Sequence, residues 1–314
     1  MKKVLLIISL VLIVAGGVVS GLSIKGFIEK NNAKYEEVST DVDQEFTKIN
    51  IDTHVSDIYI RMSSDESCKV VCVERETTKH EVKVEDGTLK ITSEDKTKFI
   101  DSLFSIDTRP VSATIYLNKT LYEDLIIVGR TGDVNVEKGF TFNTADIKVS
   151  TGDVNFTSDV TLLLNISGST AGLLVKDVNA KDIKLKATTG DIEVKNTNVT
   201  DSLTINGQTS KIRLESIRCK ELTSNNTTGD VKVKDVIVEN KMTIIASTGD
   251  ISLDKCDAET LYLKATTGDI KGTLLSGKTF KATTSTGKNY TSPTTGGECE
   301  VITTTGDINI EVIE

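Results

Sequence analysis

The sequence is poor in the residues that usually equip a catalytic cleft. Its 314 residues include no tryptophan, two histidines and two prolines, and aromatic residues make up 4% of the chain. Few aromatic rings remain to stack on sugars, and His54 and His80 are the only histidines available as a general base. Valine, isoleucine, leucine and threonine dominate instead. That composition favours pleated strands packed in a thin layer.

A basic character is also missing. The formal net charge is −9, and no cluster of lysine and arginine is apparent on one repeat face of the sequence. Proteins that bind nucleic acid need such a face, so the sequence argues against a nucleic-acid partner.

Cysteine is scarce, and the five present are an odd number that cannot all pair within the chain. Cys68 and Cys72 are four residues apart on an expected strand, about 13 Å from each other, which is too far for a disulfide. A metal site would need a CxxC pair or a nearby histidine, and neither is evident in the sequence. We therefore expect no metal and no cofactor.

The N-terminus carries the one long apolar run. Residues 4–24 contain no charge and are long enough to span a bilayer as a helix. Lys2 and Lys3 place residues 1–3 in the cytoplasm, so the rest of the chain is expected outside the cell membrane. A cleaved signal sequence would also fit this run. Residues 25–40 are interpreted as a polar tether in either case.

Residues 41–124 predict a β-rich entry cap. Asp86 and Gly87 lie between two alternating segments and indicate a tight hairpin. The segment 55–60 resembles a diverged copy of the repeat that fills the rest of the chain. We expect this region to form irregular first rungs and to hide the open edge of a repeat structure.

A Thr-Gly-Asp unit recurs through residues 125–314. Its middle residues, together with three degenerate copies, are spaced by 19 or 20 residues, so ten copies follow one another. The degenerate copies are Thr170-Ala171-Gly172, Thr209-Ser210-Lys211 and Thr286-Gly287-Lys288. The seven complete copies are Thr131-Gly132-Asp133, Thr151-Gly152-Asp153, Thr189-Gly190-Asp191, Thr228-Gly229-Asp230, Thr248-Gly249-Asp250, Thr267-Gly268-Asp269 and Thr305-Gly306-Asp307.

Apolar residues alternate on both sides of each unit, at positions −7, −5, +2 and +4 from its middle residue. A weaker apolar column at +7 and +9 suggests a third side. Identical columns must stack, so the sequence predicts an all-β, single-chain parallel β-solenoid of about ten rungs, with right-handed coiling as the expectation. Cys219, Cys256 and Cys299 fall in three different inward columns and are expected to be core residues. Glu311 and Glu314 would then guard an open last rung against edge pairing.

The unit itself is interpreted as a structural corner. The threonine is expected to point inward, the glycine to supply a positive φ, and the aspartate to accept backbone N–H bonds just after the turn. Calcium bound along the aspartate column is the alternative, although one carboxylate per rung is few for six to eight ligands.

These features resemble the bacterial putative-adhesin, TGD-repeat family, which includes LiaG-like envelope proteins. The resemblance rests on the N-terminal anchor, the segment 86–91 and the repeated Thr-Gly-Asp-Ile/Val series, and it covers nearly everything after residue 40. Leu117-Asn118 departs from the Leu-Pro that the family tends to show. The resemblance implies a β-solenoid outside the cell membrane and supplies no catalytic residues.

Three functions follow as hypotheses. The first is a membrane-anchored, adhesin-like binding or structural protein whose partner is a wall polymer or an envelope protein. The second, by family analogy, is an accessory to an envelope stress-sensing system. The third is a carbohydrate-active enzyme, which is disfavoured because His54 and His80 lie outside the repeats and aromatic residues are scarce.

Overall fold

The computed structural model of the protein describes residues 35–95 and 111–313. Every element assigned within these ranges is a β-strand, as the sequence predicts. None of the described residues forms a helix long and apolar enough to cross a membrane. The expected anchor or signal sequence, residues 4–24, lies outside the described residues.

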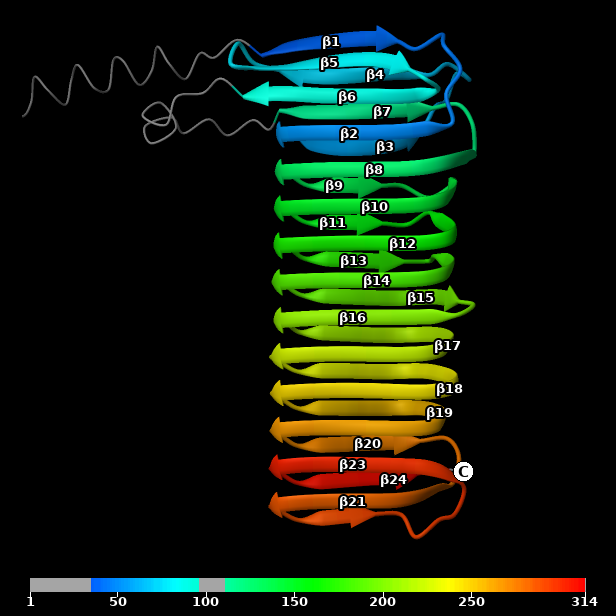
Figure 1. Cartoon of the computed structure of the whole chain (residues 1–314), viewed down its shortest axis with the longest axis vertical. Coiled ribbons are helices and arrows are strands. Elements are labelled where there is room, and N and C mark those ends of the chain that lie inside the picture. The colour runs from blue at the N-terminus through cyan, green and yellow to red at the C-terminus, as the bar shows by residue number, and fades with distance from the viewer. Residues whose placement is uncertain (1–34, 96–110, 314) are drawn as a thin grey trace, which may run out of the picture.

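The strands form a ladder of stacked rungs (Figure 1). From β8 onward each rung turns at a Thr-Gly-Asp unit or at one of its degenerate copies. Each rung takes the name of the middle residue of its corner. The strands before the corner form one side, face A, and the strands after it form the opposite side, face B. Face A contains β5 (Thr78–Glu85), β6 (Thr88–Asp95), β2 (Lys48–Val55), β8 (Leu121–Thr131), β10 (Thr141–Thr151), β12 (Asp159–Thr170), β14 (Asn179–Thr189), β16 (Ser202–Thr209), β23 (Gly297–Thr305) and β21 (Lys278–Thr286).

Face B is built from shorter strands. It contains β1 (Glu36–Asp41), β4 (Lys69–Glu74), β7 (Ser112–Leu117), β3 (Asp57–Met62), β9 (Val134–Val136), β11 (Val154–Phe156), β13 (Leu173–Lys176), β15 (Ile192–Val199), β20 (Ile270–Leu274), β24 (Ile308–Val312) and β22 (Asn289–Thr291). Three long strands run from face B round to face A, namely β17 (Ile212–Thr228), β18 (Val231–Thr248) and β19 (Ile251–Thr267).

Equivalent positions pair from rung to rung. Ile147 pairs with Ile127 on one side and with Ile166 on the other, and all three side chains are fully buried. The four inward columns that the sequence predicts are buried throughout most of the stack, which confirms the parallel β-solenoid of about ten rungs. A single rung buries too little apolar surface to stand alone, so stacking supplies the core.

The third side is also present. Ile217 pairs with Val236 and Cys219 with Val238, beyond a second corner at position +6. Five residues at this corner have φ between 47° and 57°, although none of them is glycine: Asp177, Asn196, Ser216, Asp235 and Lys255. Asparagine and aspartate tolerate this left-handed conformation best, which explains three of the five choices. Cys219, Cys256 and Cys299 are buried in the core, as predicted.

The C-terminal end corrects one prediction. The last rung in the sequence, β23 and β24, does not lie at the end of the stack. It pairs with β19 and β20 on one side and with β21 and β22 on the other (Figure 1). The chain therefore passes over one rung position and returns to fill it. The rung that carries Glu311 is internal, and Glu314 is outside the described residues.

Apolar content explains this order. The inserted rung has the apolar pair Ile308 and Ile310 at +2 and +4, where the rung of Gly287 has Asn289 and Thr291. Placing the apolar rung inside and the polar rung at the open end removes more apolar surface from water. The Gly287 copy departs from the repeat pattern because its rung lies at the open end of the stack, where fewer apolar residues are buried.

The N-terminal end is capped, but the cap begins earlier than expected, because β1 (Glu36–Asp41) lies mostly within residues 25–40, the expected tether. Strands β4 and β5 run antiparallel to β7 and β6, and β1 runs antiparallel to β4. Asp86 and Gly87 both have positive φ, at 48° and 69°, and form the predicted hairpin between β5 and β6. Strand β2 pairs with both β6 and β8, so residues 48–62 form a true rung below the cap.

Candidate functional site

Glycine is required at the Thr-Gly-Asp corners because the backbone of the adjacent rung lies too close to leave room for a side chain. Gly152 has φ 122°, and a Cβ placed on it would lie 2.1 Å from the carbonyl oxygen of Gly132 in the preceding rung. Contacts of 2.0–2.4 Å with an equivalent oxygen recur at Gly190, Gly229, Gly249, Gly268 and Gly306. The predicted positive φ of these glycines is confirmed. Stacking adds a second requirement for glycine, which an isolated turn would not have.

The aspartates connect one rung to the next. Oδ1 of Asp133 accepts the backbone N–H of Asp153 at 2.8 Å, and Oδ1 of Asp153 accepts that of Gly172 at 2.7 Å. The same bond begins at Asp57 in the diverged corner, whose Oδ1 accepts from Asp133 at 2.9 Å. The prediction of a backbone N–H partner was right, but the partner belongs to the neighbouring rung.

The bond extends along most of the column. Asp191, Asp230, Asp250, Asp269 and Asp307 each accept the backbone N–H of the equivalent residue in an adjacent rung. At the degenerate corners Lys211 and Lys288 donate their backbone N–H to this ladder. One oxygen of each carboxylate is thus engaged by backbone, which favours the corner interpretation over calcium.

The threonines correct another prediction. The side chain at position −1 is exposed in all ten copies and does not point inward. The buried residue lies two positions earlier, for example Val149, Ala187 and Ala246 at position −3. The strict alternation ends before the corner, so positions −2 and −1 both face solvent. The result is a continuous threonine row along the edge of face A, formed by Thr131, Thr151, Thr170, Thr189, Thr209, Thr228, Thr248, Thr267, Thr286 and Thr305.

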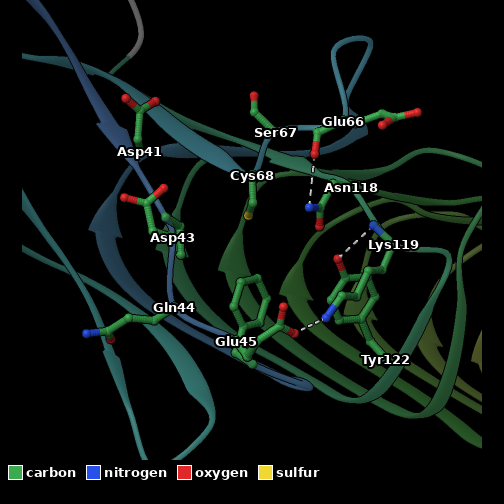
Figure 2. A pocket seen from close by; sticks show the side chains of 12 residues that line it. Asp41, Asp43, Gln44, Glu45, Glu66, Ser67, Cys68, Asn118, Lys119 and Tyr122 are labelled. Atoms are coloured by element: carbon green, nitrogen blue, oxygen red, sulfur yellow. Dashed lines mark hydrogen bonds and ion pairs between the residues drawn. The ribbon is translucent and has the colours of Figure 1, made fainter.

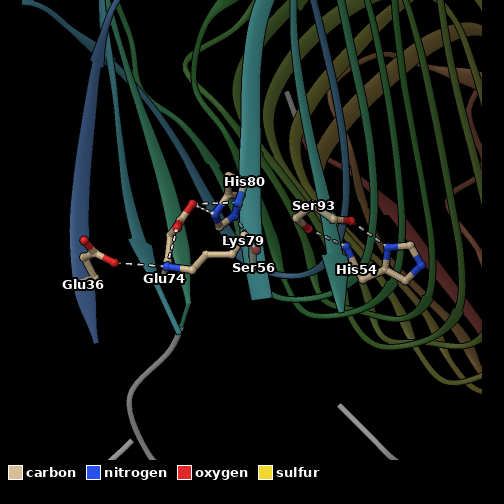
Figure 3. A network of polar contacts seen from close by, with 7 residues as sticks. All are labelled: Glu36, His54, Ser56, Glu74, Lys79, His80 and Ser93. Atoms are coloured by element: carbon tan, nitrogen blue, oxygen red, sulfur yellow. Dashed lines mark hydrogen bonds and ion pairs between the residues drawn. The ribbon is translucent and has the colours of Figure 1, made fainter. Parts of the chain in front are cut away.

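A polar network lies where the cap meets the first corner (Figure 3). Oγ of Ser56 is 2.9 Å from Nε2 of His80, and Nδ1 of His80 is 3.3 Å from Oε1 of Glu74. The same Glu74 oxygen accepts the backbone N–H of His80 at 2.6 Å. Lys79 lies between Oε2 of Glu74, at 3.2 Å, and Oε2 of Glu36, at 3.1 Å. The network joins β1, β4 and β5 to the corner of Ser56.

The serine, histidine and glutamate of this network follow the order of a catalytic triad, but the site is closed. Ser56 is 3% exposed, and the His80 side chain is 0% exposed. Burial lowers the pKa of His80, against the opposing effect of Glu74, so the imidazole is neutral at pH 7. Ser56 and the His80 side chain are therefore buried, and their hydrogen bonds join the cap to the first corner.

Cys72, Glu74 and His80 also form a group whose ligand atoms lie within 4.8 Å of one another. This group was not predicted from the sequence, because His80 lies on β5 whereas Cys72 and Glu74 lie on β4. Burial and Glu74 raise the pKa of the Cys72 thiol to about 12, and Lys79 places a cation against the carboxylate. Both effects disfavour a metal ion, since metal binding requires a thiolate and unshared carboxylate oxygens.

An acidic hollow opens on the other side of the cap (Figure 2). Glu45 forms an ion pair with Lys119, whose backbone N–H donates to the hydroxyl of Tyr122 at 3.3 Å. Burial raises the pKa of Tyr122 to about 12 and that of Cys68 to about 11. The carboxylates of Asp41, Asp43 and Glu66 also line the hollow.

Neither of these sites was foreseen. The strands that bring Ser56, Glu74 and His80 together are local in sequence but pair through an antiparallel cap, whose register the repeat pattern does not contain. The alternation within residues 69–74 could have indicated one feature, since it places Glu74 on the inward face with Val70 and Cys72.

Comparison with known proteins agrees with this architecture. A family model described as "Toastrack DUF4097" matches residues 46–311, in keeping with the resemblance to the TGD-repeat family. No curated protein matches the chain.

Similar folds occur among solved structures. A crystal structure named "putative lipid binding protein from Parabacteroides distasonis ATCC 8503" is 16% identical, covers 90% of this chain and 98% of its own, and has a TM-score of 0.52. A "putative adhesin" from the same organism is 15% identical, covers 90% and 98%, and has a TM-score of 0.49. A "putative adhesin (BF0245) from Bacteroides fragilis NCTC 9343" is 15% identical, covers 88% and 97%, and has a TM-score of 0.44. The first of these, at 16% identity, speaks for the fold alone, and the two with TM-scores under 0.5 carry no argument.

Proposed function

The chain belongs to the Toastrack DUF4097 family, and on that premise we propose that it is a non-catalytic binding or structural protein of the cell envelope. Residues 4–24 hold it in the membrane, and the solenoid projects outside the cell. Its partner is a repetitive polymer of the wall or an envelope protein, contacted along one side of the solenoid.

The exposed threonine row is the observation that carries this proposal. It presents ten equivalent hydroxyl groups, one in each rung, at a spacing of about 4.8 Å. Along the described rungs, no hydrogen bond within the protein occupies these ten hydroxyls. Position −2 adds further exposed hydroxyl groups, such as Ser150, Ser169 and Thr188. A row of unoccupied donors and acceptors at a fixed interval suits a ligand that is itself repetitive.

The rigid frame supports the same conclusion. The rows of strands are continuous on both faces, so the hydroxyl groups are held on the ends of paired strands and not on loops. A ligand that binds such a row requires little ordering of the protein, which lowers the entropic cost of association. A catalytic function has less support, because Ser56 and the His80 side chain, which resemble part of a triad, are buried.

The test is retention of the full chain on purified cell wall. A quadruple variant, T189V/T209V/T228V/T248V, removes four hydroxyl groups and keeps the β-branched shape. We expect it to lose most of the retention. The matched control, T204V/T223V/T243V, alters outward threonines at position −6 of face A and should leave retention unchanged. Retention that is absent in the wild type, or equal in both variants, would contradict the proposal.

A further inference from the structure

A basic groove on face A crosses the rungs of Gly132 to Gly190. Arg130, Lys148 and Lys186 line it, at positions −2, −4 and −4 of their rungs. Among the described residues no carboxylate lines the groove. This is unusual in a chain with a net charge of −9, and the acidic hollow of the cap shows the opposite character.

Small residues lie beneath the groove. Gly129 and Gly168 occupy the inward position −3 in two of its rungs, and Val149 and Ala187 occupy it in the other two. Ser150, Ser167, Ser169 and Thr188 add hydroxyl groups to the lining, and Val128 and Val149 add apolar surface.

The cations are available to a ligand. Arg130 and Lys186 are exposed and form no ion pair with the rest of the described chain. Lys148 contacts Asp146 at 2.6 Å, but the side chains are 56% and 36% exposed, so the pair is screened by water and readily exchanged. The three residues lie at rungs 132, 152 and 190. They therefore span three rung steps, or about 14 Å.

We propose that this groove binds a linear phosphodiester polymer, with Arg130, Lys148 and Lys186 each contacting a phosphate. The inference rests on the proposed function and names the chemistry of its partner. A span of about 14 Å favours a chain with several anionic groups over a single small anion. Arginine is suited to bind two phosphate oxygens at once, and the serine hydroxyls supply neutral donors between the charges. The groove also borders the threonine row, so one polymer can run along both.

This basic groove was not predicted from the sequence. The three cations are separated by 18 and 38 residues, and they converge only because equivalent strands stack. The expectation that no lysine and arginine cluster on one repeat face is thereby corrected, since these three cations share face A.

The experiment measures binding of poly(glycerol phosphate) to the full chain in nanodiscs of zwitterionic lipid. Three phosphate contacts predict that affinity falls about 15–20-fold when salt rises from 50 to 200 mM. The variant R130Q/K148Q/K186Q should weaken binding at least tenfold. The control variant K220Q/K232Q/K241Q removes three exposed charges outside the groove and should change affinity less than twofold. Matched thermal unfolding of both variants confirms that the fold is kept.

Three outcomes would overturn the proposal. The first is no binding of the polymer by the wild type at 50 mM salt. The second is an equal loss in both triple variants, which would indicate a response to net charge. The third is equally tight binding of a carboxylated polysaccharide, which would remove the phosphodiester assignment. If the wild type is still retained on cell wall in any of these cases, the proposed function stands and only the groove is rejected.

Discussion

The backbone N–H of Asp153 donates a hydrogen bond of 2.8 Å to Oδ1 of Asp133, the residue at the same position one rung earlier. The bond satisfies a backbone donor at a corner, where the strand ladder is interrupted. It also makes each Thr-Gly-Asp unit a connection between rungs. The motif recurs for this reason, and its recurrence does not require a ligand.

The aspartate bond can be tested at Asp133. Replacing it with alanine leaves the N–H of Asp153 without its acceptor, and we expect the free energy of unfolding to fall by about 1 kcal/mol. Asp133→Asn keeps a carbonyl oxygen in the same place and should recover most of the loss. Urea unfolding followed by circular dichroism measures both. Equal destabilisation by the two variants would show that charge, and not hydrogen bonding, carries the effect.

The corner glycines differ from glycines elsewhere in the strands. In Gly152→Ala, the new Cβ meets the carbonyl oxygen of Gly132 at 2.1 Å, and a φ of 122° costs about 1–3 kcal/mol by itself. Gly129→Ala is the control, since its Cβ would meet Cγ1 of Val149 at 3.6 Å, an ordinary contact. Thermal unfolding should show a large loss for the first variant and a small change for the second. Similar melting temperatures for both would contradict the stacking explanation.

The rung order at the C-terminal end predicts an inverted protection pattern. Strand β23 is paired on both sides, whereas β21 has a described partner on one side only. Amides of residues 299–303 should therefore exchange more slowly with solvent than those of residues 280–284, although they are nearer the chain terminus. Hydrogen exchange read by mass spectrometry can separate the two peptides. Faster exchange in 299–303 would indicate that the last rung lies at the end of the stack after all.

His80 makes stability depend on pH. Burial lowers its pKa in the folded protein below the usual 6.5, so the unfolded chain binds a proton more readily. This contribution to stability is complete above pH 6.5 and is lost as pH falls through the folded pKa. We expect His80→Gln to reduce the decline in the free energy of unfolding between pH 6.5 and pH 5. An unchanged slope would show that other groups dominate; His54→Gln serves as the matched control.

The comparison of sequence and structure is most instructive at the corner. The glycine and the inward columns were predictable, because stacking repeats a fixed geometry and the alternation of buried residues is a property of any strand. The outward threonine was not, because alternation says nothing about where the chain leaves the strand. Two consecutive residues face solvent there, and only the folded structure shows where the alternation ends.

The sequence by itself determined the solenoid. A period of 19 or 20 residues with constant apolar positions allows only stacked rungs in register, since a shifted rung would expose its core. It also determined that Asp86 and Gly87 turn a hairpin. The tertiary structure decided the order of the rungs, the assembly of Ser56, Glu74 and His80 beneath the cap, and the convergence of Arg130, Lys148 and Lys186 in one groove. These depend on contacts across the stack, where near-identical rungs can exchange places and where small differences in buried apolar surface choose among them.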